Sequence, residues 1–458
     1  MPFSPPRQTR VPYAGSPNYD PIQYSRPLPA PERGRQEKGM STSGTYTARL
    51  AARLPVHYGW IIMVAGTICV FACLGLGRFS LGMLLPSMGQ SLDLSYSQMG
   101  FISTANFIGY LFAVLVSGRI MRLLGGRRII SLALLVVGAS MMLIGRAHSM
   151  PVITLLYIVT GMGSALANVP IMALINIWFC HHRRGRAAGF VVIGSGFAII
   201  LCGSLIPQIN ALYTQGWRIN WLILGALALC CALVCSLILR NSPADLGLLP
   251  VGTDSTAARR NMAPATKDDL ALNSKIVLHC AAIYFLFGFT YVIYVTFVVT
   301  SMIEDRGFAE SAAGLFWSCI GLLSLISGPV PGAFSDKFGR KAALMCVFTI
   351  QACAYLLVAL PLPTMFLFLS IGCYGIVAWA VPSIISALVA DYAGQQRIAA
   401  IFGFVTFIFG LGQISGPYLA GLLAERTGSF SASFLLAFCM AAAAVLLSSF
   451  LPQRKAHH

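Results

Sequence analysis

Twelve long apolar runs alternate with short polar loops along this sequence, and they constrain its fold more than any other feature. An α-helix rises about 1.5 Å per residue, so each run is long enough to cross a hydrocarbon layer of roughly 30 Å. Transmembrane strands instead need about ten residues of alternating character. The sequence therefore predicts an all-α integral membrane protein. The twelve transmembrane helices are expected at residues 58–86, 96–117, 128–145, 151–179, 187–207, 218–239, 276–303, 311–332, 342–360, 364–390, 398–423 and 430–451.

The basic residues fall almost entirely on one side of these helices. The chain has 31 Lys and Arg against 14 Asp and Glu, and its net charge of +17 would suggest nucleic-acid binding in a soluble protein. Here 57% of the residues are apolar. Only Arg146, Arg218, Arg306 and Arg426 stand in the loops opposite the N-terminal tail, and Arg78 lies within a run. The positive-inside rule then predicts both termini in the cytoplasm, a multi-pass protein in the lipid bilayer of the cytoplasmic (inner) membrane, and no nucleic-acid partner.

The order of the runs predicts two six-helix halves. Residues 1–56 are rich in proline and lack apolar periodicity, so we expect a disordered cytoplasmic tail. A polar segment at 241–274 is the expected cytoplasmic linker between an N-terminal bundle at 57–240 and a C-terminal bundle at 275–453. Residues 454–458 form a short C-terminal tail. Proline-to-arginine spacings that match between the halves indicate a parallel repeat of two bundles.

A pair of charged loops occupies equivalent places in the two halves. The stretch GAFSDKFGRK runs from Gly332 to Lys341, and a fainter copy, GRIMRLLGGR, runs from Gly118 to Arg127. A carboxylate at a helix end among Arg and Lys is well placed for charge-assisted hydrogen bonds. In chain order, the first copy (118–127) has Arg122 where the second copy (332–341) has Asp336. The predicted gating residues of these loops are Gly332, Asp336, Lys337, Arg340 and Lys341, with Gly118 and Arg127 in the weaker copy.

These loops resemble the signature that major facilitator superfamily transporters carry after helix 2 and often repeat after helix 8. The resemblance covers residues 57–453 and implies the superfamily's fold, in which two six-helix bundles rock about a mid-membrane substrate site. In the family, the Asp of the motif helps to hold the outward-facing arrangement. The segments HYGW at 57–60, GWR at 216–218 and SPADLGLLPVG at 242–252 are similar to monocarboxylate and oxalate/formate porters. The segment YFLFGFTYVIYVTF at 284–297, in the seventh predicted helix, is similar to a bacterial branch of transporters near these porters. This similarity implies a bacterial protein.

Arg78 is the strongest candidate for substrate binding. It lies well inside the first apolar run, where an ionised side chain costs at least about 2.5 to 3.5 kcal/mol and needs a partner. No acidic residue lies inside any predicted helix, and the nearest are Glu304 and Asp305 at the end of helix 7. One interpretation is a gate between Arg78 and these carboxylates, or an Arg78 side chain that reaches the outer interface. The other is an anion-binding site whose missing negative charge belongs to the substrate.

Helix 7 offers a row of aromatic residues on one helical face, at Tyr284, Phe287, Tyr291 and Tyr294. Tyrosines there present hydroxyls beside flat apolar walls, which suits a compact or aromatic organic acid. Interhelical packing is the alternative for this row. Single polar or amphipathic residues in other helices are candidates for the same site, or else contacts between helices. They are Asn106, Asn168, Trp379 and Gln413.

No phosphate-binding loop, nucleophile motif or zinc signature is present, so the sequence predicts a transporter and not an enzyme. We expect no metal site and no cofactor, with coupling to protons or another ion left open. The 13 cysteines lie in or beside apolar runs and are expected to be small hydrophobic residues. The predicted function is secondary transport of a small organic solute, most consistent with an anion, by a monomer. Efflux of amphipathic drugs and a membrane receptor that does not transport are the alternatives.

Overall fold

The computed structural model describes residues 56–253, 274–392 and 398–452, and nearly all of them are helical. Eleven helices are long and apolar enough to cross a membrane, and a bent pair of helices makes a twelfth span. The prediction of a twelve-helix membrane protein is therefore confirmed. Of the expected tail at 1–56, only Val56 is described. Residues 254–273 of the linker and the whole C-terminal tail at 454–458 also lie outside the described residues.

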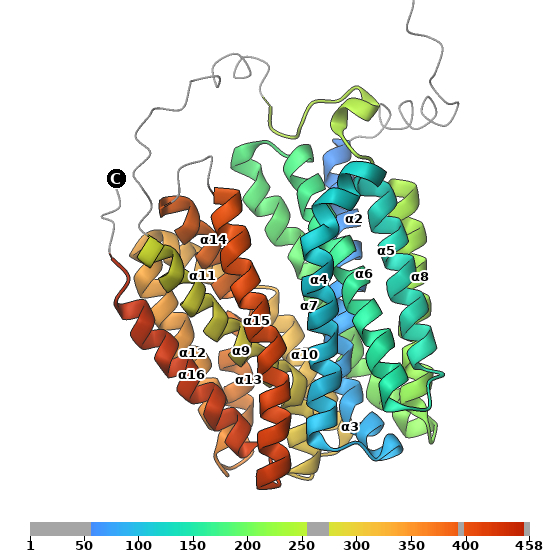
Figure 1. The fold of residues 1–458 in the computed structure, drawn as a ribbon, viewed down its shortest axis with the longest axis vertical. Helices are drawn as coiled ribbons and strands as arrows, with labels where there is room; N and C mark the ends of the chain where they lie inside the picture. The colour runs from blue at the N-terminus through green and yellow to red at the C-terminus, as the bar shows by residue number, and fades with distance from the viewer. Residues whose placement is uncertain (1–55, 254–273, 393–397, 453–458) are drawn as a thin grey trace, which may run out of the picture.

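The first eight elements form one bundle (Figure 1). Its first span combines three consecutive elements: α2 (Tyr58–Val70), the π-helix η1 (Phe71–Phe79) and α3 (Ser80–Leu92). The helix α4 packs on α6, and α5 packs on both α6 and α8. The other helices of this bundle are α4 (Tyr96–Leu124), α5 (Gly126–Ile144), α6 (Met150–Trp178), α7 (His181–Leu212) and α8 (Gly216–Ile238).

The second bundle contains α9 to α16 and includes two broken spans. The helices α10 and α11 meet at a bend of 45°, and α13 and α14 are separated at Ala378 and Trp379. The backbone N–H of Trp379 donates to Ser327 Oγ, 3.2 Å away, which ties the two breaks together. The helices are α9 (Ser274–Glu304), α10 (Glu310–Ser324), α11 (Pro329–Phe338), α12 (Arg340–Ala359), α13 (Met365–Val377), α14 (Ala380–Tyr392), α15 (Ile398–Thr427) and α16 (Ser431–Ser449).

The paired charged loops share one backbone conformation. Gly125 separates α4 from α5 with φ 78° and ψ 155°, and Gly339 separates α11 from α12 with φ 89° and ψ 156°. Both are the eighth residue of their ten-residue stretch. Because L-residues with a side chain rarely adopt this positive φ, glycine is required at both turns. The identical geometry supports the repeat that the sequence predicts.

A segment after α8 packs against one end of the first bundle, and we call that end of the molecule the linker side and the opposite end the far side. This segment includes the short 3-10 helix η2 (Pro243–Leu246). Val251 pairs with Phe179 at the end of α6 through an isolated β-bridge, and His57 Nε2 lies 3.1 Å from the carbonyl oxygen of Leu249. The first part of the expected linker, residues 241–253, is therefore attached to the N-terminal bundle.

The two bundles touch at the far side and are separated at the linker side (Figure 1). A Cβ placed on Gly203 of α7 would lie 2.4 Å from the carbonyl oxygen of Gly314 in α10, and one on Gly100 of α4 would lie 2.3 Å from that of Pro417 in α15. Glycines nearer the linker side of the same helices have open space: Gly118 in α4 and Gly189 in α7 would meet nothing within 4 Å. The structure is thus closed at the far side.

Candidate transport site and its gates

Arg78 lies on the π-helix η1, inside the first span and only 9% exposed. Its Nε donates to Asn106 Oδ1 on α4 (3.2 Å). The guanidinium also lies over the rings of Phe107 and Tyr110, with its carbon 4.6 Å and 4.3 Å from their centroids. These cation–π contacts stabilise a desolvated cation without neutralising it. Its Nη2 is buried and has no hydrogen-bond partner.

A network within the first bundle fixes the position of this arginine. Asn106 Nδ2 donates to the carbonyl oxygen of Tyr157 on α6 (3.3 Å), and the Tyr157 hydroxyl donates to the carbonyl oxygen of Arg78 (3.1 Å). Asn168 Nδ2 is bonded to the Tyr110 hydroxyl (2.9 Å). The helices η1, α4 and α6 thereby hold one polar surface, since each bond joins two of them.

The second bundle presents an aromatic wall opposite Arg78. Tyr291 on α9 interacts with Arg78, and its hydroxyl accepts a hydrogen bond from Gln413 Nε2 on α15. The ring of Phe287 stacks on Tyr291 at 4.9 Å, and that of Phe409 stacks on Tyr284 at 4.2 Å. A small cavity beside Arg78 also lies between the bundles, and its lining does not include these aromatic residues. It is lined by Arg78, Phe79, Asn106, Tyr157, Val295 and Thr296, among others.

Trp379 completes this wall from the break between α13 and α14. Its ring meets Tyr291 edge-on at 6.0 Å and approaches Phe79, the neighbour of Arg78, at 5.1 Å. Its indole Nε1 is buried without a hydrogen-bond partner, as is Asn168 Oδ1. Arg78, Asn168 and Trp379 thus each carry one buried polar atom without a hydrogen-bond partner.

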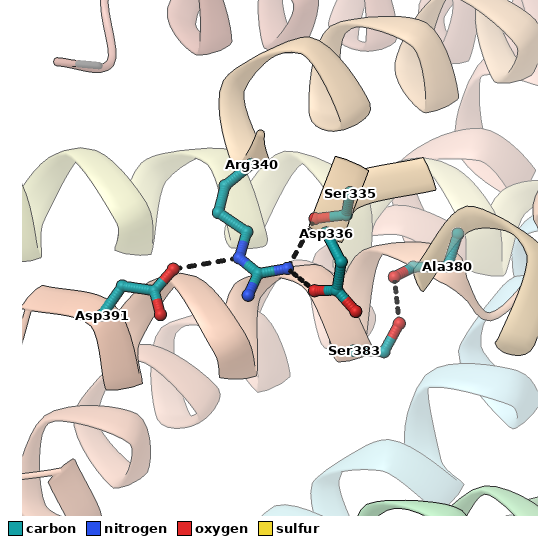
Figure 2. A network of polar contacts seen from close by, with 6 residues as sticks. All are labelled: Ser335, Asp336, Arg340, Ala380, Ser383 and Asp391. Atoms are coloured by element: carbon teal, nitrogen blue, oxygen red, sulfur yellow. Dashed lines mark hydrogen bonds and ion pairs between the residues drawn. The ribbon is translucent and has the colours of Figure 1, made fainter. Parts of the chain in front are cut away.

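A charged network lies at the linker side of the second bundle. Arg340, the first residue of α12, donates through Nε to Asp391 Oδ2 at the end of α14 (3.0 Å), and through Nη1 to Asp336 Oδ1 on α11. Figure 2 shows the guanidinium between these two carboxylates, with Ser335 Oγ as a third partner at 3.0 Å. The network joins the ends of three helices, α11, α12 and α14.

Comparison with known proteins identifies the family. The model of a family described as uncharacterised MFS-type transporter YbfB matches residues 70–451. The chain belongs to the major facilitator superfamily. It is 23% identical to the hexuronate transporter of Bacillus subtilis (strain 168), with 79% of this chain and 87% of that protein covered. It is 25% identical to the human monocarboxylate transporter 11, with 89% and 87% covered.

A solved structure of similar fold is the inward-open conformation of the xylose transporter XylE from E. coli. Its TM-score is 0.67 at 15% identity, with 87% of this chain and 98% of that chain covered. This likeness concerns the fold alone. The superfamily resemblance that the sequence predicts is confirmed, and the protein is a secondary transporter of the MFS type and not an enzyme.

Most of the binding residues predicted from the sequence lie near one another between the bundles, but Tyr294 does not. Arg78, Asn106, Asn168, Tyr291, Trp379 and Gln413 lie around the region between the bundles, and Tyr284 belongs to the stacked wall. The ring of Tyr294 instead stacks on Tyr374 at 4.1 Å, and its hydroxyl bonds Ser370 Oγ (2.9 Å), both on α13. In this structure Tyr294 therefore contacts residues of its own bundle.

The expected gate between Arg78 and the carboxylates of Glu304 and Asp305, at the end of α9, is not formed in this structure. The Tyr96 hydroxyl is hydrogen-bonded to Glu304. Asp305 Oδ2 accepts from Ser301 Oγ (2.8 Å) and from the backbone N–H of Phe430 (3.0 Å). Across the described ranges, the only ion pairs are those of Arg340. Glu304 nevertheless joins the bundles, since Tyr96 lies on α4.

Two further carboxylates, which sequence reasoning missed, join the bundles at the far side. Asn210 Nδ2 on α7 donates to Glu310 Oε1 on α10 (2.5 Å). Ser95 Oγ and the backbone N–H of Ser97 both donate to Glu425 Oε2 on α15 (3.0 Å each). The spacing around Glu310 gave no signal, because its partner is a hundred residues away in the other bundle.

Tyr110, Tyr157 and Phe409 were also missed as parts of the site. Tyr110 follows Asn106 by one helical turn, so the i, i+4 relation on α4 is a signal that could have found it. Tyr157 and Phe409 stand among apolar residues of α6 and α15, with no such pattern beside them. Only the packing of helices that are distant in sequence reveals their place.

The two charged loops differ in their partners. Within the second copy, Lys337 lies over the ring of Phe338 (5.3 Å), Lys341 is partly exposed on the first turn of α12, and Gly332 faces open space. In the first copy, Arg127 Nε donates to the carbonyl oxygen of Ser236 (2.9 Å), and its backbone N–H donates to Asn241 Oδ1 (2.8 Å). Arg122 is exposed. The first loop is therefore attached to α8 and the linker.

This difference predicts unequal effects of two matched substitutions. Asp336→Asn removes a carboxylate bonded to Arg340, whereas Arg122→Asn removes an exposed side chain in the equivalent place. Because the side chain of Asp336 is 71% exposed, water screens the pair, and we expect its loss to slow transport by about two- to fivefold. Arg122→Asn should change the rate less. Equal rates for the two variants in proteoliposome uptake would contradict the asymmetry.

Proposed function

We propose that this MFS protein transports a small organic anion, with a carboxylate bound to Arg78. The observation that carries the proposal is a buried guanidinium with one nitrogen unpartnered and no ion pair to an acidic residue among the described ones. A buried charge is costly unless an opposite charge accompanies it. The carboxylate of the substrate supplies that charge, and it restores the fork-shaped pairing that guanidinium prefers.

The names of the relatives support this substrate class. Hexuronates and monocarboxylates are both organic acids, and the two matches cover 79% and 89% of this chain. The aromatic wall of Tyr291, Phe287 and Phe409 lies opposite Arg78 and offers flat apolar surface for the rest of the solute. The site thus combines one cation with aromatic faces.

The conformation supports alternating access. The far side is closed by glycine contacts and by the carboxylates of Glu304, Glu310 and Glu425, while the bundles are apart at the linker side. We assign the linker side to the cytoplasm of a bacterial cell, because basic residues of alternate loops, such as Arg127, Arg240 and Arg340, lie there. In this assignment the structure is inward-facing, both termini are cytoplasmic, and the protein works as a monomer in the inner membrane.

A ligand panel tests the proposal on the purified full-length protein. Thermal shifts are measured with glucuronate, a short monocarboxylate, xylose as a neutral solute, and tetraphenylphosphonium as an amphipathic cation. We expect acids alone to raise the apparent melting temperature, because only they pair with Arg78. Stabilisation by the organic cation without any acid would contradict an anion site and favour drug efflux.

A further inference from the structure

We propose that the transported acid carries hydroxyl groups, as a sugar acid or another hydroxy acid does, and that Trp379 and Asn168 recognise them. This inference rests on the proposed function, since it takes the carboxylate on Arg78 as its starting point. The observation behind it is that Trp379 Nε1 and Asn168 Oδ1 are buried and unpartnered, on two residues that pack near Arg78 from opposite bundles. A carboxylate on Arg78 leaves both atoms without a partner.

The two atoms belong to residues close to Arg78. Asn168 is bonded to Tyr110, whose ring lies 4.3 Å from the guanidinium carbon. The ring of Trp379 lies 5.1 Å from that of Phe79, the next residue after Arg78, and 6.0 Å from that of Tyr291. A six-carbon solute held at Arg78 is long enough to approach either wall.

Their chemistry selects a hydroxyl. The indole N–H of Trp379 only donates, so it needs an oxygen acceptor on the solute. Asn168 Oδ1 only accepts, and a carboxylate or sulfonate oxygen has no hydrogen to give it. A hydroxyl both donates and accepts, and it therefore satisfies either atom, as well as either orientation of the Asn168 amide. Leaving such buried groups unpartnered costs affinity for acids that lack hydroxyls.

The aromatic wall is consistent with the same class of solute. Tyr284, Phe287, Tyr291 and Phe409 lie nearly parallel, with interplanar angles of 14° between Tyr284 and Phe409 and 17° between Phe287 and Tyr291. The outer face of this stack of rings is a flat surface for the C–H side of a sugar ring. The hydroxyls at the edge of the sugar ring then reach the polar groups of Trp379 and Asn168. The site thus separates the apolar face of the solute from its polar edge.

The test compares two ring acids that differ in their hydroxyl groups, glucuronate and cyclohexanecarboxylate, on the full-length protein in detergent. The variants are Trp379→Phe, which keeps an aromatic ring, and Asn168→Leu, which keeps the approximate shape. We expect the wild type to bind glucuronate about tenfold or more tightly than cyclohexanecarboxylate. Each variant should lose about three- to tenfold in glucuronate affinity and keep its affinity for cyclohexanecarboxylate, as one neutral hydrogen bond is removed.

Each other outcome overturns a defined part of the argument. Equal binding of the two acids by the wild type would mean that water alone serves the unpartnered atoms, and would overturn the hydroxyl assignment while leaving the anion site intact. Loss of both acids in a variant would show that the residue maintains the site's shape and recognises no hydroxyl. Binding of neither acid by the wild type would overturn the proposed function itself.

Discussion

Gly203→Leu is expected to stop transport by holding the far side of the molecule open. A Cβ at this position would lie 2.4 Å from both the carbonyl oxygen of Gly314 and the hydroxyl oxygen of Ser318, and 2.8 Å from the backbone nitrogen of Ser318. Two of these three atoms are backbone, so no side-chain rotation relieves the overlap. Overpacking of this kind costs about 1 to 3 kcal/mol or more, which reduces the far-closed population by roughly 5- to 150-fold.

The matched control is Gly189→Leu on the same helix. A Cβ there would meet nothing within 4 Å, so the closed far side should tolerate it. The measurement is the distance between spin labels at Tyr213 and Thr427, both exposed at far-side helix ends. The labels are best introduced as unnatural amino acids, because the chain has 13 cysteines. A lengthened distance in Gly203→Leu alone is expected; an unchanged distance would refute the role of this contact.

The sequence predicted the twelve spans and the two-bundle repeat because these features follow from local patterns. An apolar run of sufficient length requires a helix in a membrane, whatever its neighbours are. The glycine at the eighth position of each charged loop likewise reports its own backbone conformation, φ 78° at Gly125 and 89° at Gly339. The break at Trp379 was not predicted, and its backbone N–H bonds a residue of another span, Ser327.

The candidate site was predicted less completely, because its polar residues are identified by their rarity and its aromatic residues are not. Arg78 and Asn106 stand out within apolar runs, and the structure joins them directly. Tyr294 shares a helical face with Tyr291 in the sequence pattern, yet the two tyrosines contact different neighbours. Rotation of α9 within its bundle decides which one reaches the site, and no local pattern contains that rotation.

The carboxylates of the far side illustrate the same limit in another way. Glu310 begins α10 and looks like an ordinary first-turn residue of a helix, where negative charge is favourable. Its role at the interface depends on Asn210, which is itself held by Asn220 Nδ2 at 2.9 Å. The sequence supplies each of these residues, whereas the docking of the bundles supplies their relation.

Arg78→Gln is expected to abolish acid binding while leaving the stability of the ligand-free protein nearly unchanged. The substitution removes two charge-assisted hydrogen bonds to the substrate carboxylate, each worth about 1.5 to 3 kcal/mol, so acid affinity should fall at least about 100-fold. In the ligand-free protein it removes cation–π contacts with Phe107 and Tyr110. It also relieves the burial of an unpaired charge, a cost of about 2.5 to 3.5 kcal/mol that offsets their loss.

Arg306→Gln provides the opposite pattern as a control. Arg306 donates three hydrogen bonds, to the carbonyl oxygens of Val358, Leu360 and Leu362, and so caps the far-side end of α12. Its loss leaves helix-end carbonyls unpartnered, so the apparent melting temperature should fall by several degrees while acids still stabilise the variant. If Arg78→Gln instead melts as early as Arg306→Gln and acids still stabilise it, Arg78 is a structural residue, and the anion must bind elsewhere.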